Sequence, residues 1–225
     1  MDNFNKARWI WHNSYRDSNV YVNFEDGFTL GEIPTECRIK ISCDRNYALY
    51  LNGEFVDCGQ YSDYEDMKFY DELDIAPFVK TGRNSLLAVV YYQGKSCSTY
   101  RHGEPGLIFK VTADGAVVCA SSENTEAYKN SAFADGSGIE MVSGQLGFTF
   151  HYDATREDER VDLKSADIVN KTYDIHPRPI EKLTIEPPMK SGMINKGIFF
   201  DTKSGTPAEK MQAAALSGQY LCGSI

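Results

Sequence analysis

The stretch that decides the fold is residues 47–56, YALYLNGEFV, in which the dipeptide Asn52-Gly53 interrupts an apolar run. Asn and Gly both tolerate the positive φ angles that a two-residue hairpin turn requires, and the twist of that turn matches the twist of the paired strands. Residues 47–56 are therefore predicted to form two antiparallel strands joined by a tight turn.

Strand patterns continue on both sides of this hairpin. Residues 37–43, CRIKISC, alternate apolar and polar side chains, which predicts a strand with one buried and one solvent-facing side. Residues 85–92, SLLAVVYY, form a continuous apolar run that is typical of a central strand covered on both faces. Residues 106–111 and 116–120 are two further strands, joined by an Asp114-Gly115 turn, and we expect two more at residues 145–152 and 196–200.

Short strands separated by turn residues predict an all-β fold, an antiparallel β-sandwich. The composition changes near residue 155, where a charge-dense stretch is followed by the proline-rich residues 176–179 and 187–188. We therefore place the sandwich at residues 1–155. Residues 156–225 are expected to be a linker and the start of a following β domain, with extended segments and one short helix. That helix is predicted to begin at the capping box of residues 206–209, TPAE, and to end near Gly218.

The charge and hydropathy of the chain exclude two classes of partner. With 32 acidic and 23 basic residues the net charge is −9, and the sequence lacks the basic cluster that a nucleic-acid-binding surface needs. The longest uncharged apolar run is residues 86–92, far short of the ~20 residues that cross a bilayer. We expect no nucleic-acid partner and no membrane insertion.

The cysteines and carboxylates give little support for a metal or cofactor. The six cysteines contain no C-x-x-C pair, so we expect buried, reduced thiols rather than a zinc site or a disulfide framework. Oxygen ligands for a structural calcium ion are available at Asp57, Asp63 and Asp66, but their spacing matches no calcium-binding loop. The sequence predicts no cofactor, and unpaired cysteines with no leader-like N-terminus slightly favour the cytoplasm.

A resemblance to a known family rests on residues 44–53 (DRNYALYLNG), 70–79 (YDELDIAPFV) and 82–84 (GRN). Their order is similar to that in galactose-binding-like, jelly-roll sandwiches, which occur at the N-terminus of bacterial α-L-rhamnosidases and as accessory domains of β-galactosidases and β-glucuronidases. Flanking segments narrow the resemblance to the rhamnosidases: residues 7–11, 145–148, 152–154, 176–180 and 198–202. The resemblance spans about residues 7–215, close to the whole chain.

In that family, hydrolysis takes place in an (α/α)6 barrel that follows the β domains, where carboxylates protonate the glycosidic oxygen and activate water. The twenty residues after Gly205 are too few to build such a barrel. The resemblance therefore implies a non-catalytic accessory part of a rhamnosidase-like glycoside hydrolase acting on rhamnose-containing glycans. It also implies no catalytic residues in this chain, and the barrel of the parent protein as a partner.

Two loops rich in aromatic and charged residues are candidates for contact with a glycan. Sugars are held by aromatic rings that pack on C–H faces and by polar groups that fix the hydroxyls. The candidates are Tyr61, Tyr64, Tyr70 and Asp71 in the first loop, and Tyr100, Arg101 and His102 in the second. The alternative is that these tyrosines cover the core with their hydroxyls in water.

Two further functions remain open from the sequence. The chain is either a free-standing, lectin-like carbohydrate-binding module or a purely structural interaction domain. The structural alternative predicts an exposed apolar surface over residues 187–225, through which copies of the chain could self-associate.

Overall fold

The structure is a computed structural model. It describes residues 4–59, 63–143, 145–183, 185 and 192, and the backbone of two short C-terminal strands. The chain divides into two compact units, Met1–Lys182 and Leu183–Ile225. Within the second unit, β16 (Gly197–Phe199) and β17 (Cys222–Ser224) pair antiparallel. The strand predicted at residues 196–200 is thus confirmed, whereas the helix predicted over residues 206–218 lies outside the described residues.

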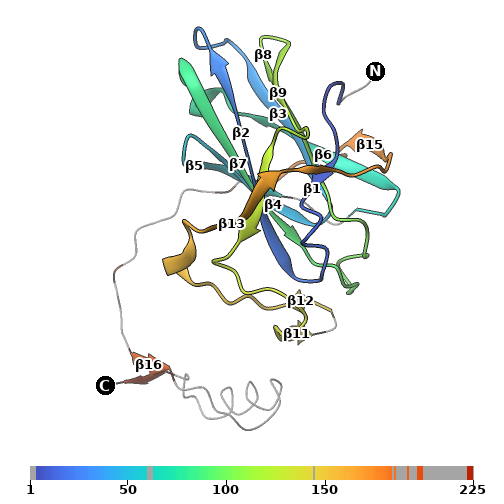
Figure 1. The fold of residues 1–225 in the computed structure, drawn as a ribbon, viewed down its shortest axis with the longest axis vertical. Helices are drawn as coiled ribbons and strands as arrows, with labels where there is room; N and C mark the ends of the chain where they lie inside the picture. Colours follow the sequence, from blue (N-terminus) through green and yellow to red (C-terminus); the bar gives the residue numbers. More distant parts are fainter. Residues whose placement is uncertain are drawn as a thin grey trace. The chain divides into compact units, whose positions relative to one another are not determined.

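The first unit is built on a seven-stranded and a six-stranded sheet (Figure 1). Along its main path the seven-stranded sheet runs β14 (Asp167–Ile168), β1 (Ile10–Trp11), β8 (Leu107–Ala113), β3 (Cys37–Cys43), β6 (Met67–Asp74) and β15 (Asp174–Pro177), and β9 (Ala116–Ala120) pairs with β8. All its pairings are antiparallel except that of β15 with β6.

The six-stranded sheet is antiparallel throughout. Its order is β13 (Arg160–Ser165), β10 (Glu126–Asn130), β2 (Val20–Leu30), β7 (Gly82–Tyr92), β4 (Asn46–Leu51) and β5 (Glu54–Gly59). The remaining elements are a small hairpin and two single 3-10 turns, namely β11 (Met141–Ser143), β12 (Gly147–Phe148), η1 (Ala76–Phe78) and η2 (Ala154–Arg156).

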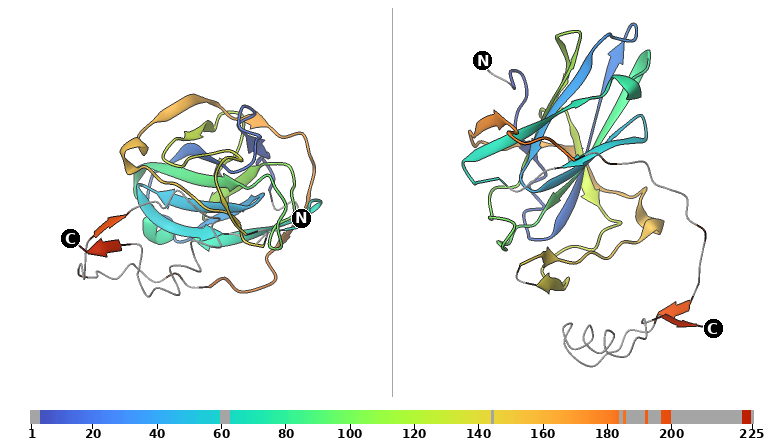
Figure 2. Two further views of the ribbon diagram at one scale, coloured as in Figure 1. Left: turned by 90° about the horizontal axis from the view of Figure 1, so that it is seen from below. Right: turned by 180° about the vertical axis from the view of Figure 1, so that it is seen from behind.

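The two sheets lie face to face and enclose the core (Figures 1 and 2). Trp11 of β1 and Phe109 of β8 come from one sheet, and Phe24 of β2 comes from the other; all three side chains are completely buried. The centroids of the Trp11 and Phe24 rings are 5.6 Å apart, so the layers contact each other directly. The predicted all-β, antiparallel sandwich is confirmed.

The predicted hairpin is also confirmed. Leu51 pairs with Glu54, and the two intervening residues, Asn52 and Gly53, have φ angles of 54° and 84°. The Asn52 side chain then reaches out of the turn to the Asn84 side-chain oxygen at 2.9 Å and to the Phe78 carbonyl at 2.8 Å. The segments that carry the family resemblance are therefore joined by hydrogen bonds in the folded chain.

The sandwich extends beyond the boundary placed at residue 155, which corrects the expected domain limits. β13 pairs with β10, β14 with β1 and β15 with β6, so residues 160–177 supply strands to both sheets. The charges and prolines that suggested a linker are compatible with these strands because β13 and β15 are edge strands, which tolerate exposed charges and a missing N–H donor.

A smaller correction concerns residues 145–152, which we expected to form one strand. Only Gly147–Phe148 is a strand, and an isolated bridge joins Tyr152 to Phe133. Four of the described cysteines, Cys37, Cys43, Cys97 and Cys119, are buried free thiols as predicted, whereas Cys58 is free but exposed. Among the described residues, no helix has the length and apolar character needed to span a membrane.

Candidate functional site

The structure separates the residues that the sequence offered as a glycan site. Tyr61 lies outside the described residues, and Tyr64 is 73% exposed. Tyr70 is buried on the outer side of the seven-stranded sheet, where its ring packs edge-on against Phe4 at a centroid distance of 5.4 Å. Tyr64 is thus free to meet a ligand, whereas Tyr70 is part of a small hydrophobic cluster.

Asp71 is a buried, ion-paired carboxylate rather than a surface group. It is 4% exposed, accepts a 2.6 Å hydrogen bond from the Tyr47 hydroxyl, and forms a 2.7 Å ion pair with the Arg178 guanidinium. Arg178 also faces the buried Asp63 carboxylate at 3.5 Å. The Asp71 and Asp63 carboxylates thus belong to a buried network that holds Arg178, in the segment after β15, against the sandwich.

In the second predicted loop Tyr100 is directed inward, whereas His102 lies at the surface. The buried Tyr100 donates a 2.5 Å hydrogen bond to Asp44, and the Tyr92 hydroxyl lies 2.9 Å from Nε2 of His102. Arg101 is exposed. The burial of Tyr70 and Tyr100 agrees with the alternative that the tyrosines cover the core, but the Tyr100 hydroxyl is bonded to Asp44 instead of lying in water.

A wide groove instead lies on the outer face of the six-stranded sheet. It has a volume of about 990 Å³, and its floor comes from the central strands β2, β7 and β4. In β2, Val20, Val22 and Phe24 point into the core, so the alternate residues face the groove. The aromatic side chains that line the groove are Tyr21, Tyr50, Tyr91, Tyr128, Phe133, Phe150 and Tyr152.

Four rings form a continuous cluster at one part of this groove. Tyr21 and Phe133 are stacked with centroids 4.0 Å apart, and Tyr91 lies 4.6 Å from Tyr21. Tyr152 lies 4.7 Å from Phe133 and is 45% exposed. Phe150, whose ring lies 6.3 Å from that of Phe133, is 67% exposed and adds an accessible ring face to this cluster.

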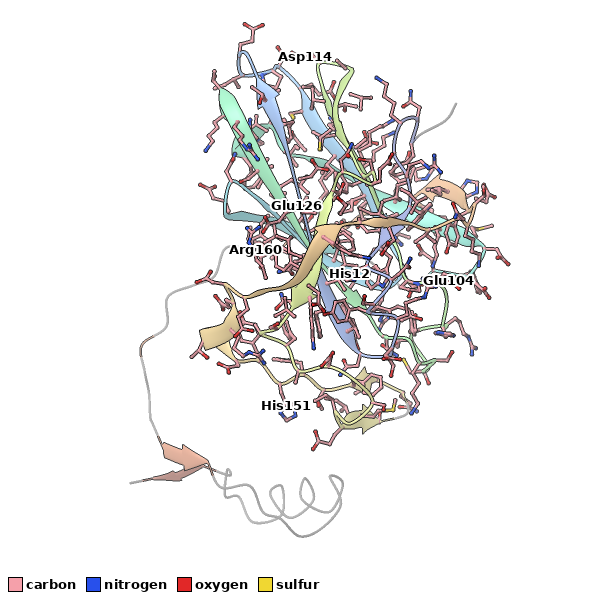
Figure 3. All side chains as sticks on the ribbon, viewed as in Figure 1. His12, Glu104, Asp114, Glu126, His151 and Arg160 are labelled. Atoms are coloured by element: carbon pink, nitrogen blue, oxygen red, sulfur yellow. The ribbon has the colours of Figure 1, made fainter. Side chains whose placement is uncertain are left out.

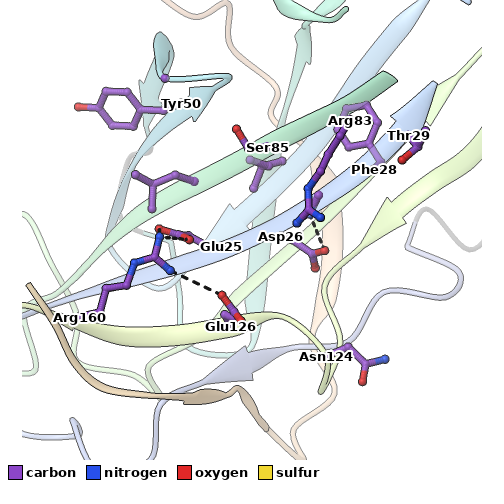
Figure 4. A pocket seen from close by; sticks show the side chains of 14 residues that line it. Glu25, Asp26, Phe28, Thr29, Tyr50, Arg83, Ser85, Asn124, Glu126 and Arg160 are labelled. Carbon is purple, nitrogen blue, oxygen red and sulfur yellow. Dashed lines mark hydrogen bonds and ion pairs between the residues drawn. The ribbon is translucent and has the colours of Figure 1, made fainter. Parts of the chain in front are cut away.

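The groove continues into a second hollow of about 630 Å³, with which it shares Glu25, Tyr50, Gly53, Leu87 and Arg160 (Figure 4). The Arg160 guanidinium lies 2.8 Å from Glu25 and 3.7 Å from Glu126. Arg160 and Glu126 come from the neighbouring strands β13 and β10 (Figure 3). This part of the groove is polar, and its guanidinium is already paired with carboxylates.

The tyrosine hydroxyls of the groove are hydrogen-bond donors at neutral pH. Burial raises the pKa of Tyr21 to about 12. Burial and the hydrogen bond to Glu25 raise the pKa of Tyr128 to about 12, and its hydroxyl donates to Glu25 at 2.5 Å. Protonated hydroxyls combined with aromatic ring faces match what a sugar presents to a protein.

Each carboxylate that could have held calcium faces a cation instead. Asp57 lies 2.6 Å from the Lys182 ammonium, Asp63 faces Arg178, and Asp66 lies 3.7 Å from Lys171. Within the part of the chain that the structure describes, no group of three or more His, Cys, Asp or Glu side chains is arranged to hold a metal ion.

The sequence analysis did not predict the groove, although the pattern of residues 85–92 indicates it. Leu87, Val89 and Tyr91 are apolar but alternate with the buried residues, so they point away from the core. We expected a layer of protein on that side because both faces of the strand are apolar. The structure shows that this second face is instead the floor of the groove, with its side chains half-buried.

No protein-family model matches the chain, and no curated protein matches it in sequence. Solved structures do match. A GH78 family rhamnosidase of Bacillus sp. GL1 is similar at a TM-score of 0.70 and 25% identity, over 78% of this chain and 20% of that one. Two α-L-rhamnosidases share the fold. That of Dictyoglumus thermophilum has a TM-score of 0.59 and 18% identity, over 79% of this chain and 22% of that one. That of Aspergillus terreus has a TM-score of 0.56 and 15% identity, over 74% of this chain and 21% of that one. The resemblance predicted from the hairpin residues is confirmed, and the chain spans about a fifth of the length of these enzymes.

Proposed function

We propose that this chain is a non-catalytic, carbohydrate-binding β-sandwich of an α-L-rhamnosidase-type glycoside hydrolase, and that the groove on the six-stranded sheet holds the glycan. The likeness to one fifth of the Bacillus sp. GL1 enzyme supports an accessory role beside a catalytic domain. The observation on which the proposal rests is the open groove lined by aromatic rings.

The chemistry of the groove suits a sugar chain. Exposed ring faces such as those of Phe150 and Tyr152 can pack against the C–H faces of pyranose rings. Asn46 and Asn130 line the same groove, and their amides have donor and acceptor capacity for hydroxyl groups beyond the bond that Asn130 already donates to Asn23. A ligand site with an apolar floor and a few polar groups of this kind is the usual arrangement for small-molecule recognition.

Replacing ring faces in the groove is expected to weaken glycan binding. Phe150→Ala and Tyr50→Ala should each lower affinity about tenfold, because each removes one aromatic contact surface. The measurement is titration calorimetry of the 225-residue chain with the best ligand from an array of rhamnose-containing glycans. Tyr64→Ala is the matched control, since it removes an exposed tyrosine that does not line the groove. Loss of binding in Tyr64→Ala with full binding in Phe150→Ala would place the site in the loop after the hairpin instead.

We expect no hydrolysis of an aryl α-L-rhamnoside by this chain. A glycosidase needs one carboxyl group to donate a proton and a second to act as base or nucleophile. In the groove, Glu25 is held by both Arg160 and Tyr128, and Glu126 also faces Arg160. The measurement is release of the aryl leaving group by the purified chain. Turnover that disappears in Glu25→Gln would show that the chain is an enzyme and would overturn the non-catalytic proposal.

A further inference from the structure

We infer that the groove selects an uncharged oligosaccharide of several sugar units over a glycan that carries carboxylate or sulfate groups. The inference rests on the proposed function and names the class of ligand for the same site. It follows from the charge, the polar groups and the extent of the groove.

The two connected hollows contain many more acidic than basic side chains. Among the described residues, their walls hold five carboxylates against two guanidinium groups and no lysine or histidine. The acidic residues are Glu25, Asp26, Glu126, Glu157 and Asp158, and the basic residues are Arg83 and Arg160. A glycan carboxylate would therefore enter a field with an excess of three negative charges, on a chain whose net charge is −9.

Arg160, the guanidinium that both hollows share, is already paired with carboxylates. Its guanidinium contacts Glu25 at 2.8 Å and Glu126 at 3.7 Å (Figure 4). It also lies over the Tyr128 ring at 5.2 Å. Binding an acidic sugar there would require Arg160 to leave two carboxylates. Bidentate capture of a carboxylate needs a free guanidinium fork, which this arrangement does not offer.

The uncharged polar groups fit a neutral sugar instead. Asn23, Asn46 and Asn130 line the aromatic part of the groove, and Ser85 and Asn124 line the second hollow. Amides and hydroxyls both donate and accept hydrogen bonds, as sugar hydroxyls do. The carboxylates can accept from sugar hydroxyls as well, so they favour a neutral ligand while repelling an anionic one.

The extent of the groove points to a chain of sugars rather than a single ring. A volume of about 990 Å³ is at the upper end of small-molecule sites, and it continues into a further hollow of about 630 Å³. The residues shared by the two hollows form a passage between the aromatic part and the polar part. A single monosaccharide would leave most of this surface uncovered.

The test compares matched glycans that differ only in charge. The 225-residue chain is titrated with rhamnogalacturonan oligosaccharides before and after reduction of their carboxyl groups. It is also screened against an array of neutral glycans and their uronate or sulfated counterparts, each present in several chain lengths. We expect the neutral member of each binding pair to bind at least about fivefold more tightly for each carboxylate removed. We also expect this gap to narrow at high salt, and affinity to rise from the monosaccharide to longer chains.

Charge variants of the groove connect this preference to the site. Glu157→Gln combined with Asp158→Asn should raise the affinity for the acidic member of a pair and so reduce the difference in affinity between the neutral and the acidic glycan. Asp66→Asn is the matched control, because its carboxylate is 91% exposed and does not line the groove, and it should leave the ratio unchanged. Equal or tighter binding of the acidic member would overturn this inference while leaving the glycan-binding proposal intact. Capture of no glycan, neutral or acidic, would overturn both.

Discussion

Arg178→Met is expected to unfold the sandwich at a temperature about 10 °C lower than the unaltered chain. Arg178 is 8% exposed, and its guanidinium faces the buried carboxylates of Asp71 at 2.7 Å and Asp63 at 3.5 Å. Methionine fills a similar volume but removes the guanidinium that faces both carboxylates, although the Lys182 ammonium stays 4.0 Å from Asp71. Removing one partner of a buried ion pair typically costs about 3–5 kcal/mol of unfolding free energy. The measurement is thermal unfolding followed by circular dichroism.

The matched control for Arg178 is Arg156→Met. Arg156 also pairs with a carboxylate, that of Glu159 at 2.8 Å, but both side chains are more than 40% exposed. Solvent screens such a pair, so we expect only a small change in unfolding temperature. Equal losses in the two variants would contradict the view that the buried network fastens the segment after β15 to the sandwich.

The loss in Arg178→Met is expected to depend on pH. Burial raises the pKa of Asp63, while the Phe69 N–H and Arg178 act against that rise. Removing Arg178 raises this pKa further, so the folded variant takes up a proton at a higher pH than the unfolded chain does. The deficit relative to the unaltered chain should therefore be largest near neutral pH. It should shrink as the pH falls through the raised pKa, because protonation removes the charge that Arg178 balanced.

Lys68→Met is expected to destabilise the chain to a similar degree, by about 3–5 kcal/mol in denaturant unfolding. The Lys68 ammonium and the Asp44 carboxylate are 3.1 Å apart, and each side chain is only 2% exposed. Burial raises the pKa of Asp44, and both Lys68 and the hydrogen bond from Tyr100 act against that rise. Of these two partners, the folded Lys68→Met variant would keep the Tyr100 hydroxyl as a donor to the buried Asp44 carboxylate and would lose the ammonium group.

A double variant separates the ion pair from the packing of these side chains. Lys68→Met combined with Asp44→Asn removes both charges while keeping an acceptor for Tyr100, so it should recover part of the stability lost in Lys68→Met. If the double variant is less stable than Lys68→Met, then the loss comes from the packing of the lysine stem and not from the stranded charge.

The site was less predictable than the fold because its residues come from positions far apart in the sequence. Tyr21, Tyr50, Tyr91 and Phe133 each belong to a different segment, and only the pairing of β2, β7 and β4 brings the first three together. The candidate loops were chosen because aromatic and charged residues are adjacent there in sequence. Adjacency did not reveal that Tyr70 and Tyr100 are buried, which depends on the strands and loops that pack around them.

The sequence alone determined the local structure of this protein: the hairpin at Asn52-Gly53, the alternating strand of residues 37–43 and the layered all-β fold that these imply. Such features depend on backbone conformations and side-chain periods that neighbouring residues set by themselves. Only the tertiary structure decided that β13 and β15 complete the two sheets, and that one face of β7 lies in a groove instead of under a second layer. These outcomes depend on which distant strands pair and what covers them, which a single apolar run does not specify.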